Sequence, residues 1–508
     1  MSDTSTPAGY TFGPLERRGL LLGLSAVQVA AALVAAIVAI VLLVRGAVGP
    51  AVLWALVAVP VTVGRISGRP LMGWLPVVGR FGRRRSTGRG RHRARRAQQG
   101  MTTGADPTGT SVGPQLPPPV LPEGLEDLEL LGVALDGQEV AVVRDGRGRQ
   151  AQYVVILRGQ PDSWSLLDVA EQDRRIAGWG DALATLARQG SPVTRVQWTE
   201  RTVPDEGEAH AAYMAEAMVD MTASTLPAAV IDSYLGLNAH GAAPARAHDL
   251  LLAVRIDPRR ARNRWKQLGG DEPAACELAV DVATEWAAEL ARAGVTIIGA
   301  LSPRAAAAVI RLAYDPEART AAAVAAAHGP EAAGVAVEGA WPTAADDGWD
   351  SYRTDSAWHR TLWIEEWPRL AVDARWLGQL LLRSPEERAV SMVMEPVPEH
   401  KAVRAAEMAR VADATDEEIR QRRGFLPTAR RKAQAANVVR REEELAAGHA
   451  EMRFSGYVTI SASSAEGLEE AATSVINRAA RARLRLAPCW GEQAEAFSYT
   501  LPLGRGLD

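Results

Sequence analysis

The chain has 508 residues, a formal net charge of −3 and two cysteines, Cys276 and Cys489. This length predicts roughly three structural units. A nearly neutral charge argues against a chain that binds nucleic acid along its whole length. Two cysteines far apart argue against a disulfide framework or a zinc site, so we expect buried, reduced thiols.

The first predicted unit, residues 1–66, is a transmembrane helical hairpin. Residues Leu20 to Val44 are apolar and uncharged, which is about the length that crosses a ~30 Å hydrocarbon core. A second apolar run, Ala47 to Gly64, follows at once, so a cleaved signal peptide is not expected. Arginines flank the two runs and only Arg45 lies between them. This asymmetry predicts a plasma-membrane protein with two spans and cytoplasmic N- and C-termini.

The second predicted unit, residues 67–96, is a basic amphipathic interfacial segment. Its apolar part, "GRPLMGWLPVVGRF", precedes an arginine-rich run. We expect it to lie in the headgroup layer and bind anionic lipid. Direct DNA binding is the alternative, although no aromatic residues alternate with the arginines. The predicted membrane-anchoring residues are Trp74, Arg80, Arg83, Arg84 and Arg85.

A linker and a first lobe are predicted next. Residues 97–124 are rich in Gly, Thr and Pro and too poor in apolar residues for a core, which is typical of a tether. Residues 125–340 are predicted to form a first cytoplasmic α+β lobe. Three short apolar runs separated by turns indicate a strand meander, and alternating strand and helix patterns follow it. Repeated strand–helix–strand units predict sheets covered by helices and suggest a duplication.

The predicted second α+β lobe, residues 341–508, carries a charged helical insertion. The insertion has mixed-sign charge, as solvated helices do. Tryptophans crowd the start of this lobe. Tryptophan is enriched at interfaces because it buries a large area and keeps a polar group, although core packing is the simpler interpretation. The candidate partner-interface residues are Trp363, Trp367 and Trp376.

Familiar catalytic motifs do not occur in the sequence. It contains no G-x-x-x-x-G-K-[ST] phosphate loop, no H-E-x-x-H and no G-x-S-x-G, so conventional ATP hydrolysis has no site. His240, His248, His359 and His400 are interpreted as ordinary surface or core histidines. We therefore expect no enzyme activity, no catalytic residues, no cofactor and no metal.

Several stretches resemble components of conjugation-type secretion loci. "YTFGPLERRGLLLGLSAVQ" resembles actinobacterial integral membrane proteins of such loci, with an N-terminus similar to the PrgI family of small conjugation membrane proteins. "WSLLDVAEQDRRIAGWGDALATLARQG", "WIEEWPRLAVDARWLGQLLLR" and "QAEAFSYTLPLGRGL" resemble the non-ATPase N-terminal region of TraC/VirB-type transfer ATPases. In that family a motor domain follows such an ending, whereas this chain ends at Asp508.

The resemblance implies a membrane-anchored, non-catalytic platform subunit of a type IV-like secretion or conjugative apparatus. Its implied partners are membrane lipid, a separate phosphate-loop transfer ATPase, other channel subunits and further copies of itself. Two alternatives stay open. One is an EccE-like component of type VII protein secretion, which also has two N-terminal helices. The other is a membrane-tethered enzyme of an unrecognised type.

Overall fold

The structure is a computed structural model. It describes residues 26–66, 69–94, 121–135, 137–160, 164–204, 229–230, 233, 236, 246–327, 333–368, 370–382, 385–408, 443–444 and 448–507. Three sequence-based expectations fall outside these residues: nearly all of the predicted linker, most of the charged insertion, and His240.

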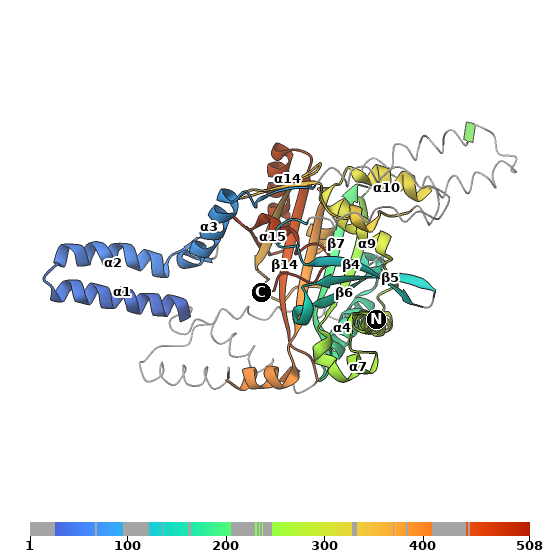
Figure 1. Ribbon diagram of the computed structural model, residues 1–508, viewed down its shortest axis with the longest axis horizontal. Helices are drawn as coiled ribbons and strands as arrows, with labels where there is room; N and C mark the ends of the chain where they lie inside the picture. Colours follow the sequence, from blue (N-terminus) through green and yellow to red (C-terminus); the bar gives the residue numbers. More distant parts are fainter. Residues whose placement is uncertain are drawn as a thin grey trace, which may run out of the picture.

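The described chain alternates strands and helices after an N-terminal helical part (Figure 1). Its helices are α1 Ala26–Val44, α2 Val48–Val63, α3 Leu71–Ser86, α4 Val169–Leu186, α7 Arg262–Gln267, α8 Glu272–Arg292, α9 Pro303–Tyr314, α10 Ala318–Ala327, α11 Gly378–Leu381, α14 Ala465–Arg481 and α15 Gln493–Phe497. Short 3-10 turns are η2 Gly148–Gln150, η3 Trp164–Leu166, η4 Pro258–Ala261 and η5 Val337–Gly339.

Two of the strands form a small ladder of their own, β1 Arg65–Ile66 and β2 Arg69–Pro70. The others are β3 Arg91–Arg93, β4 Leu128–Leu135, β5 Gln138–Asp145, β6 Gln152–Gly159, β7 Val193–Pro204, β8 Arg246–Ile256, β9 Ile297–Ala300, β10 Ala344–Asp347, β11 Tyr352–Thr354, β12 Trp358–Glu366, β13 Arg388–Pro396, β14 Met452–Ala462 and β15 Arg485–Pro488.

One thirteen-stranded antiparallel sheet organises the body. Its order is β3-β10-β11-β12-β14-β13-β7-β8-β6-β5-β4, with β15 also paired to β12 and β9 to β6. The meander expected from the sequence is confirmed as β4, β5 and β6, and the α+β class is confirmed with it. Both predicted lobes contribute to this sheet, because β7 of the first pairs with β13 of the second.

The sheet contains the same topology twice. In the first half, β6, α4, β7, β8, α8 and β9 follow one another, and their strands lie in the order β9-β6-β8-β7. In the second half, β12, α11, β13, β14, α14 and β15 give the order β15-β12-β14-β13. Each half is therefore a β-α-β-β-α-β unit of the ferredoxin-like kind. The duplication suspected from the sequence is present as repeated topology, joined through the β7–β13 ladder.

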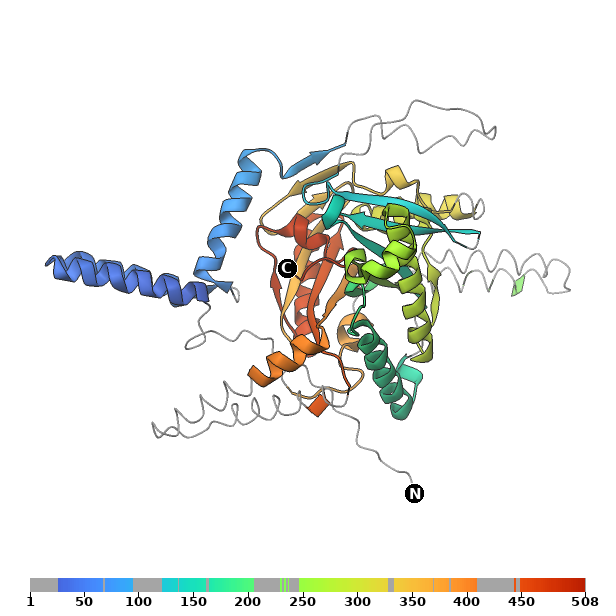
Figure 2. The same cartoon turned by 60° about the horizontal axis from the view of Figure 1, so that its bottom comes forward.

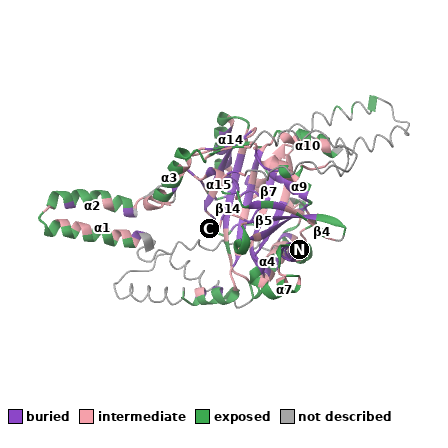
Figure 3. Cartoon of the chain, in the orientation of Figure 1, coloured by how far each residue is buried: buried purple, intermediate pink, exposed green. Residues whose placement is uncertain are grey.

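The two faces of the sheet are covered differently. On the helical face, α4, α8 and α14 pack over apolar residues that alternate along the strands, such as Val196 of β7 and Val458 of β14. On the opposite face, which we call the tail face, α9, α15 and residues 498–507 cover Val154, Leu251 and their neighbours. Both faces are buried along the central strands (Figure 3). This double burial places polar side chains of the central strands, Gln197 and Thr199 of β7 among them, inside the core.

The predicted transmembrane hairpin is wrong. Among the residues that the structure describes, no helix has both the length and the apolar character needed to cross a membrane. At 1.5 Å per residue, the 16 residues of α2 extend about 24 Å, less than a ~30 Å hydrocarbon core. The first predicted span began at Leu20, but α1 begins at Ala26 and residues 20–25 lie outside the described part. The two-span topology and the plasma-membrane location predicted from it are therefore corrected.

The two helices do form a hairpin, which extends away from the sheet (Figures 1 and 2). Gln28 Nε2 of α1 donates to the Thr62 carbonyl at 2.9 Å, and Trp54 Nε1 of α2 donates to the Ala35 carbonyl at 3.0 Å. These side-chain hydrogen bonds connect the helices near the open end of the hairpin and near its middle. Many of the apolar side chains on the hairpin, Leu33 and Leu56 among them, are exposed.

Helix α3 and strand β3, in the segment predicted to be interfacial, both contact the folded body. The aromatic rings of Trp74 and Phe81 lie 6.2 and 5.1 Å from the ring of Trp349. Strand β3 pairs with β10 at the sheet edge. The apolar side of α3 thus packs against protein. The amphipathic pattern was recognised correctly, but the sequence did not indicate which apolar surface would cover it.

Candidate functional site

The three tryptophans predicted at a partner interface do not share one surface. Trp367 is 7% exposed and packs on the helical face, with its ring 5.1 Å from Phe454 and 6.5 Å from Trp376. Trp376 is half-buried beside it. Trp363 points to the tail face, because its neighbours Leu362 and Ile364 belong to the helical-face core. Its Nε1 donates to Ser455 Oγ at 3.2 Å.

The first connections of the two halves contact each other, and both carry exposed apolar residues. Trp164 Nε1 donates to the Ala374 carbonyl at 3.1 Å, which joins the segment before α4 to the segment before α11. Leu166 is 84% exposed, Leu370 69% and Leu382 60%. We call Leu166, Val169, Leu370, Trp376 and Leu382 the cross-half surface. It lies on the helical face, where α11 packs against α14.

The predicted anchoring residues of α3 separate into two groups. Trp74, Arg80 and Arg84 contact the body: Arg80 Nη2 lies 2.6 Å from Glu492 Oε1, and Arg69 Nη1 lies 2.8 Å from Glu492 Oε2. Arg84 lies 3.4 to 3.7 Å from the carboxylates of Glu123, Asp347 and Glu495. Arg83 and Arg85 are exposed.

A buried polar network fixes residues 498–507 to the tail face. Gln197, in the middle of β7, donates through Nε2 to the carbonyls of Tyr499 and Leu501 at 3.0 and 2.9 Å, and its Oε1 accepts from the Gly504 amide at 2.6 Å. The Tyr457 hydroxyl donates to the Gly506 carbonyl. One amide side chain thereby satisfies three backbone groups in the core, where an unpaired polar group would cost about 1–3 kcal/mol.

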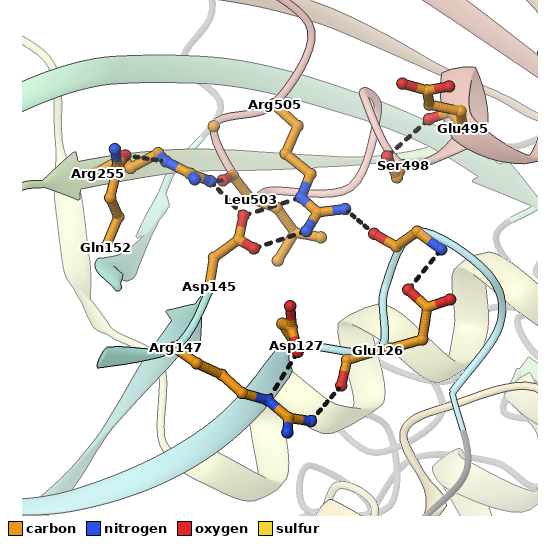
Figure 4. A network of polar contacts seen from close by, with 12 residues as sticks. Glu126, Asp127, Asp145, Arg147, Gln152, Arg255, Glu495, Ser498, Leu503 and Arg505 are labelled. Atoms are coloured by element: carbon orange, nitrogen blue, oxygen red, sulfur yellow. Dashed lines mark hydrogen bonds and ion pairs between the residues drawn. The ribbon is translucent and has the colours of Figure 1, made fainter. Parts of the chain in front are cut away.

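Asp145 is the charged centre of this network (Figure 4). It ends β5 and accepts hydrogen bonds from Arg255 of β8 and from Arg505. Burial raises the pKa of Asp145, but the hydrogen bond from Arg505 and the charge of Arg255 outweigh burial and lower it overall. Burial lowers the pKa of Arg255, and the charge of Asp145 opposes that change. The carboxylate is therefore held ionised between two arginines.

A polar cavity of about 460 Å³ lies beside this network. Its wall comes from α3, Gly124, the ends of β5 to β8, Arg260 of η4, and the segment from Glu495 to Arg505. Thr194 contributes a hydroxyl that donates to the Arg255 carbonyl at 3.1 Å. Cavities of this size commonly hold small molecules.

His359 is a buried histidine of the core, whereas His400 lies at the surface. His359 is fully buried, with Nε2 2.7 Å from Thr354 Oγ1 and Nδ1 2.9 Å from Ser461 Oγ. Burial lowers its pKa to about 3. His400 is exposed.

One Thr–His–Glu group has the residue types of a nucleophilic site but not the geometry. His248 Nδ1 lies 2.6 Å from Glu200 Oε1 and 3.3 Å from Thr202 Oγ1. A catalytic triad instead uses the two ring nitrogens for the hydroxyl and the acid separately. Here both partners share Nδ1, so the group is a local hydrogen-bonded cluster.

Neither cysteines nor carboxylates build a metal centre in the part of the chain described. No group of three or more His, Cys, Asp and Glu side chains in these residues could hold a metal ion. Cys276 and Cys489 are both buried, as expected, and burial raises the pKa of each thiol to about 12. Neither thiol therefore has the thiolate character of a nucleophile.

Sequence reasoning missed the polar network, and one signal could have found it. Arg255 directly follows the apolar run "LLLAV", where burial of the strand demands a specific partner for a charged group. The turns of the meander were predicted, but the role of Asp145 at the start of the second turn depends on Arg505, which is 360 residues away.

Comparison with protein-family models finds no match, and comparison with curated proteins finds no significant relative.

Proposed function

We propose that this chain is a non-catalytic platform subunit of a type IV-like secretion or conjugative transfer apparatus, and that it docks a separately encoded transfer ATPase. The resemblance of residues 164–190 and 363–383 to the non-ATPase part of such ATPases motivates the partner. The observation that carries the docking role is the cross-half surface, which lies in those same two segments.

The exposed leucines of the cross-half surface suit a protein partner. Leu166, Leu370 and Leu382 each expose most of their side chain, while Trp376 supplies an aromatic side chain anchored in the core. Interface energy concentrates in such aromatic anchors surrounded by apolar contacts. A stable protein–protein interface buries about 1,200 Å² or more, so α4 and α14 beside these residues would also be covered.

The sheet beneath the cross-half surface is a continuous, rigid support for a bound protein. The cross-half surface lies over a sheet whose two halves are joined along β7 and β13, in register from Val196–Met394 to Thr202–Arg388. Rigid elements hold an interface more precisely than loops do. A transfer ATPase bound at the cross-half surface would therefore contact both halves of the sheet.

Co-purification of the full chain with the phosphate-loop ATPase encoded beside it tests the proposal. Leu370→Glu and Leu166→Glu place charges in the apolar contact and should each weaken binding about tenfold or more. Ile298→Glu is the matched control, because Ile298 is 65% exposed on β9, outside the cross-half surface. Equal binding by all three variants would reject the surface. Failure of the unmodified chain to bind would reject the docking role.

A further inference from the structure

The polar cavity beside Asp145 carries more positive than negative charge. Six arginines line it, namely Arg80, Arg84, Arg195, Arg255, Arg260 and Arg505, against four carboxylates. Arginine is the residue that recognises phosphate and carboxylate groups best, because its planar guanidinium donates two parallel hydrogen bonds.

Asp145 does not neutralise the inner end of the cavity. One carboxylate accepts from two guanidinium groups, those of Arg255 and Arg505, so the trio keeps a net positive charge. Arg260 adds a further cation at the rim and donates through Nη1 to the Val193 carbonyl at 3.1 Å. A guanidinium has five N–H donors, and a backbone carbonyl removes none of its charge.

The outer end of the cavity is formed by α3. Arg80 is bound to Glu492, and Arg84 lies among three carboxylates at distances longer than the 2.7–2.9 Å typical of charge-assisted hydrogen bonds. Arg84 could therefore turn toward a bound anion without breaking a short ion pair to Glu123, Asp347 or Glu495. The four carboxylates named here outnumber Arg80 and Arg84, so the excess positive charge of the cavity lies at its inner end.

We propose that this cavity binds a small polyanion bearing two or more phosphate or carboxylate groups. The inner arginines hold one anionic group, and Arg80 or Arg84 reaches another. This site is independent of the cross-half surface and of the docking proposal. Because α3 and the body both contribute to its wall, an occupied cavity would also strengthen their contact.

The probes are inorganic tripolyphosphate and citrate, titrated into the full chain by isothermal calorimetry at low salt. Binding of tripolyphosphate alone identifies phosphate as the recognised group, and binding of citrate alone identifies carboxylate. Binding of both supports the shared anionic chemistry. Absence of binding by either probe at millimolar concentration, with the chain folded by circular dichroism, overturns the proposal.

Arg260→Gln and Arg80→Gln locate the site. Each removes an exposed cation from the wall and should weaken binding about tenfold or more, as loss of a charged hydrogen bond does. Arg292→Gln is the control, since Arg292 is 69% exposed at the end of α8 and pairs with Glu289. Unchanged binding by the cavity variants, or an equal loss by the control, would overturn the assignment.

Discussion

Arg505 holds Asp145 through both carboxylate oxygens. Its Nε donates to Oδ2 at 2.9 Å and its Nη2 to Oδ1 at 2.7 Å, across 360 residues of sequence. Arg255 Nη1 donates to the same Oδ2 at 2.6 Å. The ion group ties β5, β8 and the segment after α15 together, so the end of the second half closes over strands of the first.

Asp145→Asn should destabilise the chain strongly. The substitution leaves Arg255 and Arg505 buried without their counter-charge, and breaking a buried pair in this way costs about 3–5 kcal/mol. Urea denaturation monitored by circular dichroism measures the change. Asp127→Asn is the matched control, because Asp127 forms a solvent-exposed ion pair with Arg147 and both side chains are more than half exposed. Similar losses in both variants would contradict the account.

Asp347 should make stability fall as pH rises from about 4 to about 6. Burial raises its pKa from 3.8 to about 6, against the hydrogen bond from the Ala494 amide and the charge of Arg84. A carboxyl with a raised pKa binds its proton more tightly in the folded state, so its contribution is complete below pH 4 and is lost as pH passes 6. The effect is about 1.4 kcal/mol for each pKa unit.

Asp347→Asn separates this effect from other titrations. His359 and Asp145 both have lowered pKa values, so they act in the opposite direction and only a comparison with the unmodified chain isolates Asp347. Between pH 4 and 6 the melting temperature of Asp347→Asn should rise relative to that of the unmodified chain, and its stability below pH 4 should change little. A constant difference between the two chains from pH 4 to 6 would show that Asp347 does not contribute this pH dependence.

Trp349→Ala should release α3 from the body. Its indole lies against Trp74 and Phe81, so the truncation removes the apolar part of the contact and leaves mainly ion pairs, which are weak when exposed. Limited trypsin digestion should then cleave faster after Arg83 to Arg85. Trp363→Ala, a half-buried tryptophan on the tail face, is the control. Equal cleavage in both variants would show that Trp349 does not hold α3.

The full chain should show no ATP turnover above background. The sequence has no phosphate loop, and the described Thr–His–Glu group lacks catalytic geometry. Phosphate release measured on highly purified protein checks this. Turnover that persists through successive purification steps would contradict a non-catalytic platform.

Local pattern was enough to predict several elements. The runs "LELLGVAL", "EVAVVRD" and "AQYVVILRG" correspond to β4, β5 and β6, because each meander strand pairs with its neighbour in sequence. Helix α14 was also recognisable. Its apolar residues Leu468, Ala472, Val475 and Ala479 recur at helical spacing, and Ser464 caps its first turn.

The features that could not be predicted depend on contacts between residues far apart in the sequence. The β7–β13 ladder joins strands almost 200 residues apart, and no local signal distinguishes these partners from others with the same alternation. Trp363 and Trp367 are close in sequence, yet a bulge in the β12–β15 pairing between Ile364 and Glu366 and the alternation of the strand place them on different faces. Amphipathic spacing predicted α3 but could not identify Trp349 as its partner.

The docking proposal is tested by hydrogen–deuterium exchange of the chain, alone and with the proposed transfer ATPase. We expect new protection in residues 164–169 and 370–382, the two segments that carry the cross-half surface, with little change in β4 or α9. Protection confined to α9 and the tail face, with residues 164–169 and 370–382 exchanging as in the free chain, would contradict it.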